Sequence, residues 1–238
     1  MDYRIIKLTD ERHDTRTFKL VPVDGEVFDF IPGQFVMLSA NIEKDGEKEL
    51  IKRAYSILSA PNHDYLELTI LKQLHGLMSN YVMTLKEGDI MDIEGPFGHF
   101  TFDDNMKFIV MVAGGIGIVP MMSMIRSLVN SPSAKKSDVK FKLFYSARKQ
   151  DELLFADELK KHSEDNENFK YILTTTRDNC DLDQCYPQRL EMDVFNMLFK
   201  HPTWHNYFIC GSLRFVQGMK DILTKEGVEK EKIKIEGY

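Results

Sequence analysis

The chain contains few cysteines, and their number and spacing limit the chemistry they can support. Cys180, Cys185 and Cys210 are the only three in 238 residues, so they do not predict a disulfide framework. A plant-type iron–sulfur cluster needs four cysteine ligands. We therefore expect any iron–sulfur group that works with this chain to belong to another protein. The spacing of Cys180 and Cys185 also differs from that of a C-x-x-C redox motif.

The sequence also lacks a long apolar run and a positive net charge. Met1 to Asp10 are polar and charged at short intervals, and we find no stretch that fits a signal peptide or a membrane span. We therefore expect a cytoplasmic protein with no membrane span. The formal net charge of −6 argues against a general nucleic-acid binder, because attraction to phosphates needs a basic surface. Hydrophobic residues (43%) and charged residues (29%) are instead typical of a globular protein with a real core.

The first hundred residues have the pattern of a small all-β domain. In Leu66–Leu71, apolar side chains alternate with Glu67 and Thr69, which is the period of a half-buried strand. Turn residues separate the apolar runs, and one helix is expected at Leu77–Leu85. This pattern predicts a closed barrel or a sandwich. The six predicted strands are Tyr3–Leu8, Thr17–Val21, Phe35–Leu38, Ala54–Leu58, Leu66–Leu71 and Ile90–Ile93.

After Asp103 the pattern changes to alternating strands and helices. Continuous apolar strands that alternate with helices predict a doubly wound parallel sheet. We therefore expect two domains, residues 1–103 and 104–238. The predicted strands are Phe108–Ala113, Phe141–Tyr145, Tyr171–Thr175, Tyr207–Cys210 and Ile233–Ile235. The predicted helices are Met121–Val129, Glu152–Lys161, Arg189–Phe199 and Phe215–Thr224.

Arg53-Ala54-Tyr55-Ser56 is a candidate ligand-binding motif on the fourth predicted strand. Arg53 and Tyr55 are two residues apart, so they point to the same side of a strand. An arginine fork suits a phosphate, and a tyrosine ring suits a flat aromatic ligand whose edge a serine hydroxyl can bond. A strand end with an exposed arginine and a core tyrosine explains the same residues as well.

His75-Gly76-Leu77-Met78-Ser79 enters the predicted helix one strand later. Gly76 allows a close backbone approach, and the N–H groups that follow it can hold an anion at the helix N-terminus. The alternative is an ordinary strand-to-helix turn with a serine near the cap.

Gly114-Gly115-Ile116-Gly117-Ile118-Val119-Pro120 follows an apolar strand and opens a helix, which is the context that a dinucleotide site requires. Gly115 and Gly117 permit a tight turn and a close backbone approach. Pro120 replaces the third glycine of the common fingerprint and fits the first helical turn. A purely structural turn is the alternative.

Two further candidates lie near the C-terminal strands. Cys210-Gly211 ends an apolar strand, where ligands bind in open α/β sheets, although a buried free cysteine is the simpler explanation. Glu236-Gly237-Tyr238 follows another predicted strand, so it is either a frayed tail or a segment held against the sheet. The methionines at positions 121, 122 and 124 indicate core packing, and we expect no metal site.

Taken in this order, the motifs resemble those of the ferredoxin–NADP reductase superfamily over essentially the whole chain. The resemblance implies a six-stranded antiparallel Greek-key barrel that binds FAD, followed by a doubly wound NAD(P)-binding domain, in a stand-alone two-domain form. Glu94-Gly95-Pro96-Phe97-Gly98 is similar to the turn that closes the family's barrel. The implied reaction is hydride transfer from NAD(P)H to FAD, followed by one-electron transfers to an acceptor.

The resemblance also implies a role for each motif. Tyr55 would stack on the flavin, Ser56 would bond near its N5 atom, and Arg53 would help to hold the pyrophosphate. Cys210 would lie beside the nicotinamide, Glu236 would orient it or relay protons, and Tyr238 would fill its stacking place and move away for hydride transfer. The implied catalytic residues are Ser56, Cys210, Glu236 and Tyr238. The implied cofactor-binding residues are Arg53, Ala54, Tyr55, Ser56, Gly76, Leu77, Met78, Ser79, Gly114, Gly115, Gly117, Pro120, Thr174, Arg177, Cys210, Gly211 and Tyr238.

The choice between NADPH and NADH depends on arginines near the adenosine end. A 2′-phosphate needs basic partners after the second and third strands of the nucleotide domain, and Arg148 and Arg177 follow those strands. Tyr186-Pro187-Gln188-Arg189 is similar to a phosphate-binding region of NADP-specific members. Solvated surface arginines explain these residues as well, and comparable arginines occur in NADH-using relatives. We expect NADPH or NADH, with a slight preference for NADPH.

Three functional hypotheses follow. The first is an NAD(P)H-dependent FAD reductase that serves an external acceptor such as ferredoxin, flavodoxin or an oxygenase component. The second is a free-flavin or ferric reductase, which would bind flavin weakly and would not co-purify with FAD. The third is a non-catalytic electron-transfer subunit of a larger complex, in which Cys180 and Cys185 would be candidate redox or contact residues.

Overall fold

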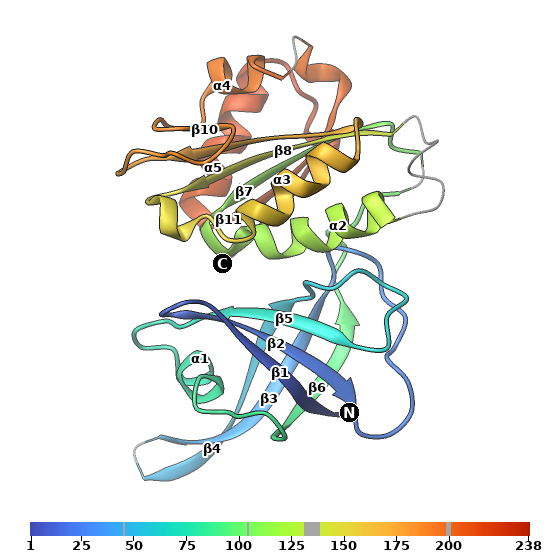
Figure 1. Cartoon of the computed structure of the whole chain (residues 1–238), viewed down its shortest axis with the longest axis vertical. Helices are drawn as coiled ribbons and strands as arrows, with labels where there is room; N and C mark the ends of the chain where they lie inside the picture. The colour runs from blue at the N-terminus through green and yellow to red at the C-terminus, as the bar shows by residue number, and fades with distance from the viewer. Residues whose placement is uncertain (45, 104, 131–138, 199–200) are drawn as a thin grey trace. The chain divides into compact units, whose positions relative to one another are not determined.

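The computed structural model describes residues 1–44, 46–103, 105–130, 139–198 and 201–238. Its contacts divide the chain into two compact units (Figure 1). The first unit comprises Met1–Thr101 and Met122–Ser127, and the second comprises Phe102–Met121 and Leu128–Tyr238. Asp104, at the predicted domain boundary, lies outside the described residues.

The first unit is built on a six-stranded antiparallel sheet, as the family resemblance implies. Its strands are β1 (Asp2–Arg12), β2 (Thr15–Pro22), β3 (Phe35–Lys44), β4 (Glu47–Ser56), β5 (Leu66–Leu71) and β6 (Ile90–Phe97). They lie in the order β4-β3-β6-β1-β2-β5. Ile57, directly after β4, forms a bridge with Leu68 of β5, so the two edge strands meet and the sheet closes into a barrel. The short helix α1 (Leu77–Val82) follows β5.

The barrel interior follows the predicted alternation, with one exception. Leu66, Leu68 and Ile70 of β5 are all buried. Thr69, expected on the exposed side, is buried as well. Its hydroxyl shares a 2.8 Å hydrogen bond with the hydroxyl of Thr17, and such a bond makes the burial of a polar group tolerable.

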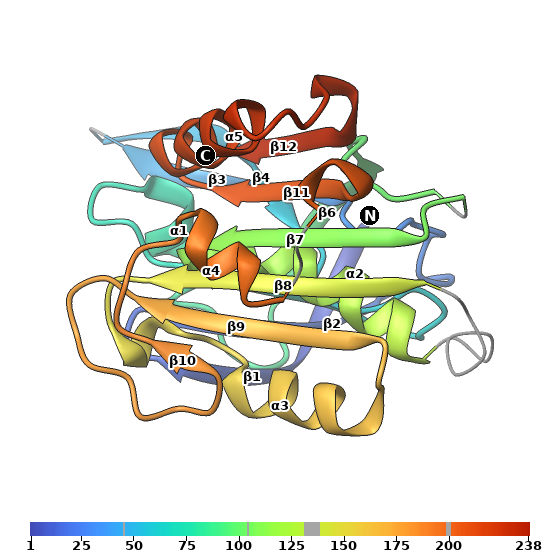
Figure 2. The same ribbon diagram turned by 90° about the horizontal axis from the view of Figure 1, so that it is seen from above.

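The second unit is a parallel sheet with helices on both faces, as predicted, and it has six strands rather than the five predicted (Figures 1 and 2). Its strands are β7 (Phe108–Gly114), β8 (Lys140–Ala147), β9 (Phe169–Thr175), β10 (Cys185–Tyr186), β11 (Asn206–Gly211) and β12 (Ile233–Gly237). Its helices are α2 (Ile118–Asn130), α3 (Ala156–Asp165), α4 (Met192–Asn196) and α5 (Leu213–Lys225), with 3-10 turns η1 (Gly115–Gly117), η2 (Gln150–Glu152), η3 (Pro202–Trp204) and η4 (Lys230–Lys232). Apolar side chains of α4 and α5 pack on one face of the central strands.

The strand order of this sheet locates a ligand site. The order is β10-β9-β8-β7-β11-β12, so the chain runs outward from β7 in one direction and then returns to add β11 and β12 on the other side. The reversal falls between β7 and β11, which are hydrogen-bonded neighbours (Figure 2). In open α/β sheets, ligands bind at the carboxyl ends of the strands at such a switch point.

Several predicted element boundaries are wrong for local reasons. The third helix begins at Ala156 rather than Glu152, because Gln150–Glu152 form a 3-10 turn and Phe155 has a left-handed φ of 61°. The fourth helix is shorter than predicted, and its predicted end, Phe199, lies outside the described residues. Residues Glu94 to Phe97, predicted as a turn, form the end of β6, and only Gly98 has a positive φ.

No helix in the described ranges is both long and apolar enough to cross a membrane.

Candidate functional site

The first candidate site, in the first unit, is the end of β4, which carries Arg53, Ala54, Tyr55 and Ser56. Strand β4 pairs with β3 on one side, and its other side is left open over these residues. Arg53 and Ala54 are exposed, whereas Tyr55 is half-buried. Burial raises the pKa of Tyr55 to about 12, and the nearby Arg53 charge opposes this shift. The motif therefore combines an exposed guanidinium with a phenol ring that stays neutral, as a ligand with a phosphate and a flat ring requires.

The loop into α1 is the second part of this first candidate site. Gly76 is the N-cap of α1, and no side chain caps the helix there. A Cβ atom on Gly76 would lie 2.9 Å from Gln73 Cβ, so only glycine fits this turn. The first N–H groups of a helix have no intrahelical acceptor, so those of Leu77 and Met78 are available to an anionic ligand.

Two side chains hold this loop in shape, and sequence reasoning identified only one of them. The Ser79 hydroxyl accepts a 3.0 Å hydrogen bond from Gln73 N and donates a 3.1 Å bond to Gly76 O, so it serves the loop itself. Asn80 Nδ2 donates 2.8 Å bonds to Gln73 O and Gly76 O, and no motif pointed to it. The loop is thus held by hydrogen bonds among its own residues.

The second candidate site, in the second unit, is the glycine-rich turn after β7. Gly115 has a φ of 55°, which favours glycine. A Cβ atom on Gly117 would collide with the carbonyl of Cys210 and lie 2.8 Å from the backbone N of Gly211. The turn and the end of β11 can therefore approach each other only because position 117 has no side chain. Gly114, Gly115, Gly117, Cys210 and Gly211 come together at the switch point.

The segment after β12 folds back onto the same turn. Strand β12 pairs in parallel with β11, with Cys210 opposite Glu236 and Gly211 opposite Gly237. The Tyr238 hydroxyl donates a 3.0 Å hydrogen bond to Gly114 O, and Tyr238 N donates a 3.2 Å bond to Gly211 O. Burial raises the pKa of the Tyr238 phenol to about 12. Tyr238 is thus held over the glycine-rich turn and is not a frayed end.

Glu236 and Cys210 lie opposite each other beside that turn, Cys210 buried and Glu236 half-buried. Burial raises the pKa of Glu236 to about 7. Its Oε2 atom is buried, and no described residue forms a hydrogen bond with it. Burial, and then the charge of Glu236, raise the pKa of the Cys210 thiol, so the thiol is neutral at physiological pH. An orphaned carboxyl oxygen beside a neutral thiol suits a polar ligand that brings its own donor, such as a carboxamide.

The residues predicted at the adenosine end lie in two different environments. Arg148 and Arg177 are exposed, and Arg177 N donates a 2.9 Å hydrogen bond to Arg148 O, so the two arginines leave the sheet side by side. Neither guanidinium pairs with a carboxylate in the part of the chain that the structure describes. Thr174, by contrast, is fully buried, and its hydroxyl has no partner among the described residues. The two arginines face solvent, whereas the Thr174 side chain lies inside the protein.

The three cysteines do not all remain free. Their number did not predict a disulfide framework, yet Cys180 and Cys185 are joined by a disulfide bond, because the turn between them brings the two side chains together. Cys210 is the free, buried cysteine. The bond lies in the loop that follows Arg177.

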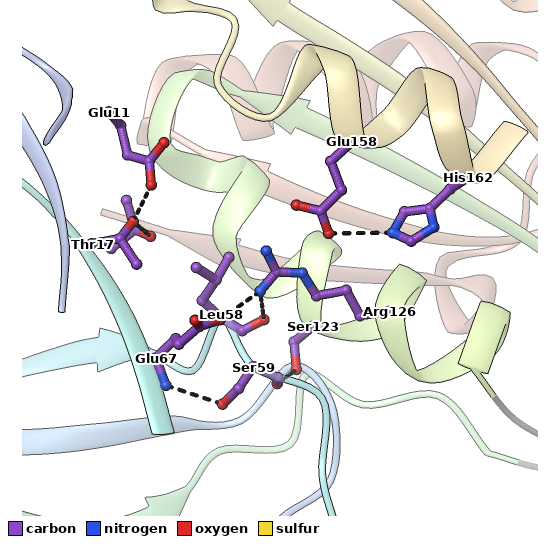
Figure 3. Close-up of polar contacts among 10 residues, drawn as sticks. Glu11, Thr17, Leu58, Ser59, Glu67, Ser123, Arg126, Glu158 and His162 are labelled. Atoms are coloured by element: carbon purple, nitrogen blue, oxygen red, sulfur yellow. Dashed lines mark hydrogen bonds and ion pairs between the residues drawn. The ribbon is translucent and has the colours of Figure 1, made fainter. Parts of the chain in front are cut away.

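A hydrogen-bonded group that sequence reasoning missed supports the chain just after Ser56. Ser123 Oγ donates a 2.7 Å hydrogen bond to Ser59 O, and Arg126 Nη1 lies 2.9 Å from Glu67 Oε2 and 3.3 Å from Leu58 O (Figure 3). All of these residues belong to the first unit. A serine and an arginine within a helix carry no motif, so no sequence signal identified them.

Comparisons with known proteins match the chain in two segments. Residues 2–102 match the family model of the oxidoreductase FAD-binding domain, and residues 111–221 match that of the oxidoreductase NAD-binding domain. The flavohemoprotein of Bacillus thuringiensis subsp. konkukian (strain 97-27) is 30% identical over 261 residues, which cover 100% of this chain and 60% of that protein. The chain thus spans about 60% of the length of the first such relatives.

Two further relatives are similar over the whole chain. The glycine betaine monooxygenase reductase subunit of Pseudomonas aeruginosa (strain UCBPP-PA14) is 28% identical over 239 residues, covering 99% of this chain and 63% of that protein. The crystal structure of a ferredoxin NADP+ reductase from Neisseria gonorrhoeae with bound FAD and NADP has a TM-score of 0.83 at 24% identity. It covers 100% of this chain and 98% of that one, and this likeness shows the shared fold.

Proposed function

The chain belongs to the ferredoxin–NADP reductase superfamily of FAD- and NAD-binding oxidoreductases, and on that premise we propose that it passes electrons from NADPH or NADH through FAD to an external one-electron acceptor. In this proposal residues 1–103 bind FAD and residues 104–238 bind the nucleotide. The observation that supports it best is the gathering of Gly117, Cys210, Glu236 and Tyr238 at the switch point of the parallel sheet.

The FAD half would work through a small set of contacts. Arg53 and the N–H groups at the start of α1 would hold the pyrophosphate, because both offer donors to an anion. Tyr55 would lie against the flat ring, and the Ser56 hydroxyl would bond to its edge. When bound, FAD accepts two electrons from a nicotinamide and passes them on singly.

The nucleotide half would use the backbone more than side chains. The turn from Gly114 to Gly117 lets the dinucleotide approach, and Pro120 lies in the first turn of α2, where an N–H is not needed. Glu236 would accept a hydrogen bond from the carboxamide of the nicotinamide, and the neutral Cys210 thiol would line the adjacent wall. Tyr238 would leave the turn when the nucleotide binds, at the cost of its hydrogen bond to Gly114 O.

For the nucleotide we propose a preference for NADPH. Arg148 and Arg177 are adjacent and exposed, and neither pairs with a carboxylate among the described residues, so together they suit a 2′-phosphate. Replacing both with Gln is expected to raise KM for NADPH about 10- to 100-fold, since a hydrogen bond to a charged group contributes about 1.5–3 kcal/mol, and to leave KM for NADH almost unchanged. Equal effects on both nucleotides would contradict the assignment.

For the electron acceptor, we propose only a class of protein. An oxygenase component fits the relative that is a monooxygenase reductase subunit, and ferredoxin or flavodoxin fits the family as a whole. We also propose a cytoplasmic location, where reduced nicotinamide nucleotides are available, and fractionation of cells would test it.

An anaerobic titration of the purified chain with NADH and NADPH in parallel, followed by flavin absorbance, tests the proposed function. We expect a yellow protein that one nucleotide, NADPH in particular, bleaches rapidly. A colourless protein would favour a reductase that binds flavin weakly. A yellow protein that is inert to both nucleotides would favour a non-catalytic electron-transfer subunit.

A further inference from the structure

The loop between β9 and β10 carries a feature that the proposed reaction does not use. Its disulfide joins Cys180 to Cys185, five residues apart. The loop-closure model of disulfide stabilisation gives a smaller gain for a shorter loop, so this bond adds less to global stability than a long-range bond would. Both cysteines are half-exposed, which leaves the bond open to a reagent in solvent. Its effect is therefore local, and its position is accessible.

The disulfide holds one side of a loop whose other side carries Arg177, and Arg148 lies on the neighbouring loop after β8. Arg177 N is bonded to Arg148 O at 2.9 Å, and Asp181 N donates a 2.7 Å bond to the side chain of Gln150. Thr175 Oγ1 donates a 2.6 Å bond to Asp178 O. The first two bonds connect the loop after β8 to the loop after β9, and the third holds the loop after β9 to itself. The disulfide then links Cys180 of this loop to Cys185, the first residue of β10.

On the β10 side, the loop is held by the disulfide together with two hydrogen bonds from β9: Leu173 N donates a 2.9 Å bond to Gln184 O, and the Tyr171 hydroxyl donates a 3.4 Å bond to Asp183 Oδ2. Strand β10 has only two residues, paired with Leu173 and Thr174 at the edge of the sheet. Gln184, inside the disulfide-closed turn, has a left-handed φ of 53°, although it is not glycine. Such a residue is strained and keeps its conformation only while its surroundings impose it. Opening the disulfide removes one of those constraints, so the turn and β10 are expected to loosen together.

We propose that the Cys180–Cys185 disulfide is a reversible thiol–disulfide exchange site that takes a dithiol reductant, and that its state sets the order of the loop that carries Arg177. A thiolate of the dithiol attacks one cysteine sulfur and forms a mixed disulfide. This step breaks the S–S bond and releases the other cysteine as a thiolate. The second thiolate of the dithiol then attacks the dithiol's own sulfur in the mixed disulfide and releases the first cysteine. The S–S bond of the chain breaks and two S–H bonds form, with two electrons and two protons gained. The dithiol becomes a disulfide.

The order of the loop bears on nucleotide affinity, and this part of the inference rests on the proposed function. If the loop is in its binding-competent form only part of the time, the apparent dissociation constant rises by the inverse of that fraction. A competent fraction of about 10–30% after reduction would weaken the binding of a 2′-phosphorylated adenosine about 3- to 10-fold. The oxidised chain would thus bind NADPH more tightly than the reduced chain.

The test compares the full chain before and after dithiothreitol, in three measurements. Alkylation followed by mass spectrometry should add no label before reduction and two labels after it, with the buried Cys210 unlabelled in both states. Hydrogen exchange should rise in peptides that span residues 174–189 and stay constant elsewhere. Calorimetric titration with adenosine 2′,5′-bisphosphate should give a 3- to 10-fold weaker affinity after reduction. The Cys180→Ser/Cys185→Ser variant should show the exchange and the affinity of the reduced chain, and dithiothreitol should change neither.

The outcomes separate this inference from the proposed function. Two labels without reduction, or unchanged exchange in residues 174–189 after reduction, would overturn the exchange site. Equal affinity in both states would overturn the link to nucleotide binding alone. A chain that binds the bisphosphate in neither state would contradict the proposed nucleotide site, and the exchange measurement would still decide whether the disulfide controls the loop.

Discussion

Glu236 gives a prediction at the scale of a single residue, because burial raises its pKa from 4.5 to about 7. Below pH 4.5 the carboxyl is protonated in both folded and unfolded chains. Between pH 4.5 and 7 only the unfolded chain loses the proton, so the free energy of unfolding falls as pH rises. We expect Glu236→Gln to remove this loss and to stabilise the chain by about 1–2 kcal/mol above pH 7, after allowing for partial exposure. Urea unfolding of both proteins at pH 4 and pH 8 measures this change in the free energy of unfolding. An equal change at the two pH values would contradict a raised pKa of Glu236.

Arg53 gives a second prediction at this scale. Its exposed guanidinium is proposed to bond a phosphate, and a hydrogen bond between charged groups contributes about 1.5–3 kcal/mol. Arg53→Ala should therefore weaken FAD binding about 10- to 100-fold, measured by the quenching of flavin fluorescence. Lys52→Ala is the matched control, since Lys52 is also exposed and pairs with Glu94 at 3.4 Å. Equal losses in both variants would point to general electrostatic attraction instead.

The sequence predicted residues whose role follows from their own chemistry and missed those whose role depends on their surroundings. Glycines 114, 115 and 117 could be identified because a tight turn requires them. The raised pKa of Glu236 could not be predicted, because it results from burial by segments far apart in the chain. Asn80 and Ser123 were missed for a related reason: each bonds backbone atoms that only the folded chain brings near.

At the scale of an element, Gly117 and Gly218 make a matched pair. A Cβ atom at position 117 would collide with the carbonyl of Cys210, and neither backbone segment can move without disturbing β11. A Cβ atom at Gly218, inside α5, would meet nothing within 4 Å. We expect Gly117→Ala to destabilise the chain by about 1–3 kcal/mol and Gly218→Ala to stabilise it by about 0.5–1 kcal/mol. Thermal unfolding of both variants measures the difference, and a loss of stability in Gly218→Ala would contradict the open space beside α5.

Element prediction succeeded where the local pattern and the tertiary contacts agree. Strand β5 has the predicted bounds, Leu66–Leu71, because its alternation is complete and turns flank it. Strand β10 was missed because two residues have no period, and it exists only through its pairing with β9. Strand β4 is longer than predicted, since its polar first half is held by register with β3 rather than by apolar side chains.

At the scale of the whole molecule, α2 belongs to both units. Residues Met122–Ser127 make their contacts in the first unit, while the start of the helix continues the glycine-rich turn of the second. Sequence alone predicted a helix there but gave no sign that its middle would pack with the barrel. The two sheets were predictable because each is specified by its own repeating pattern. The sharing of one helix was not predictable, because it depends on the bonds of Ser123 and Arg126 to three partners, the backbone of Ser59 and Leu58 and the side chain of Glu67.

This sharing predicts cooperative unfolding. A helix that contributes to two units cannot remain intact when either unit unfolds, so we expect one calorimetric transition whose measured enthalpy equals its van't Hoff enthalpy. The Ser123→Ala/Arg126→Ala variant removes the bonds to Ser59, Leu58 and Glu67, and it should separate the transition into two, with the first unit unfolding earlier. Gln217→Ala is the control, because it removes a 2.7 Å bond within α5 alone and should lower the melting temperature slightly without splitting the transition. Two transitions in the unmodified chain would show that α2 does not couple the units, and an unsplit transition in the double variant would assign the coupling to other contacts.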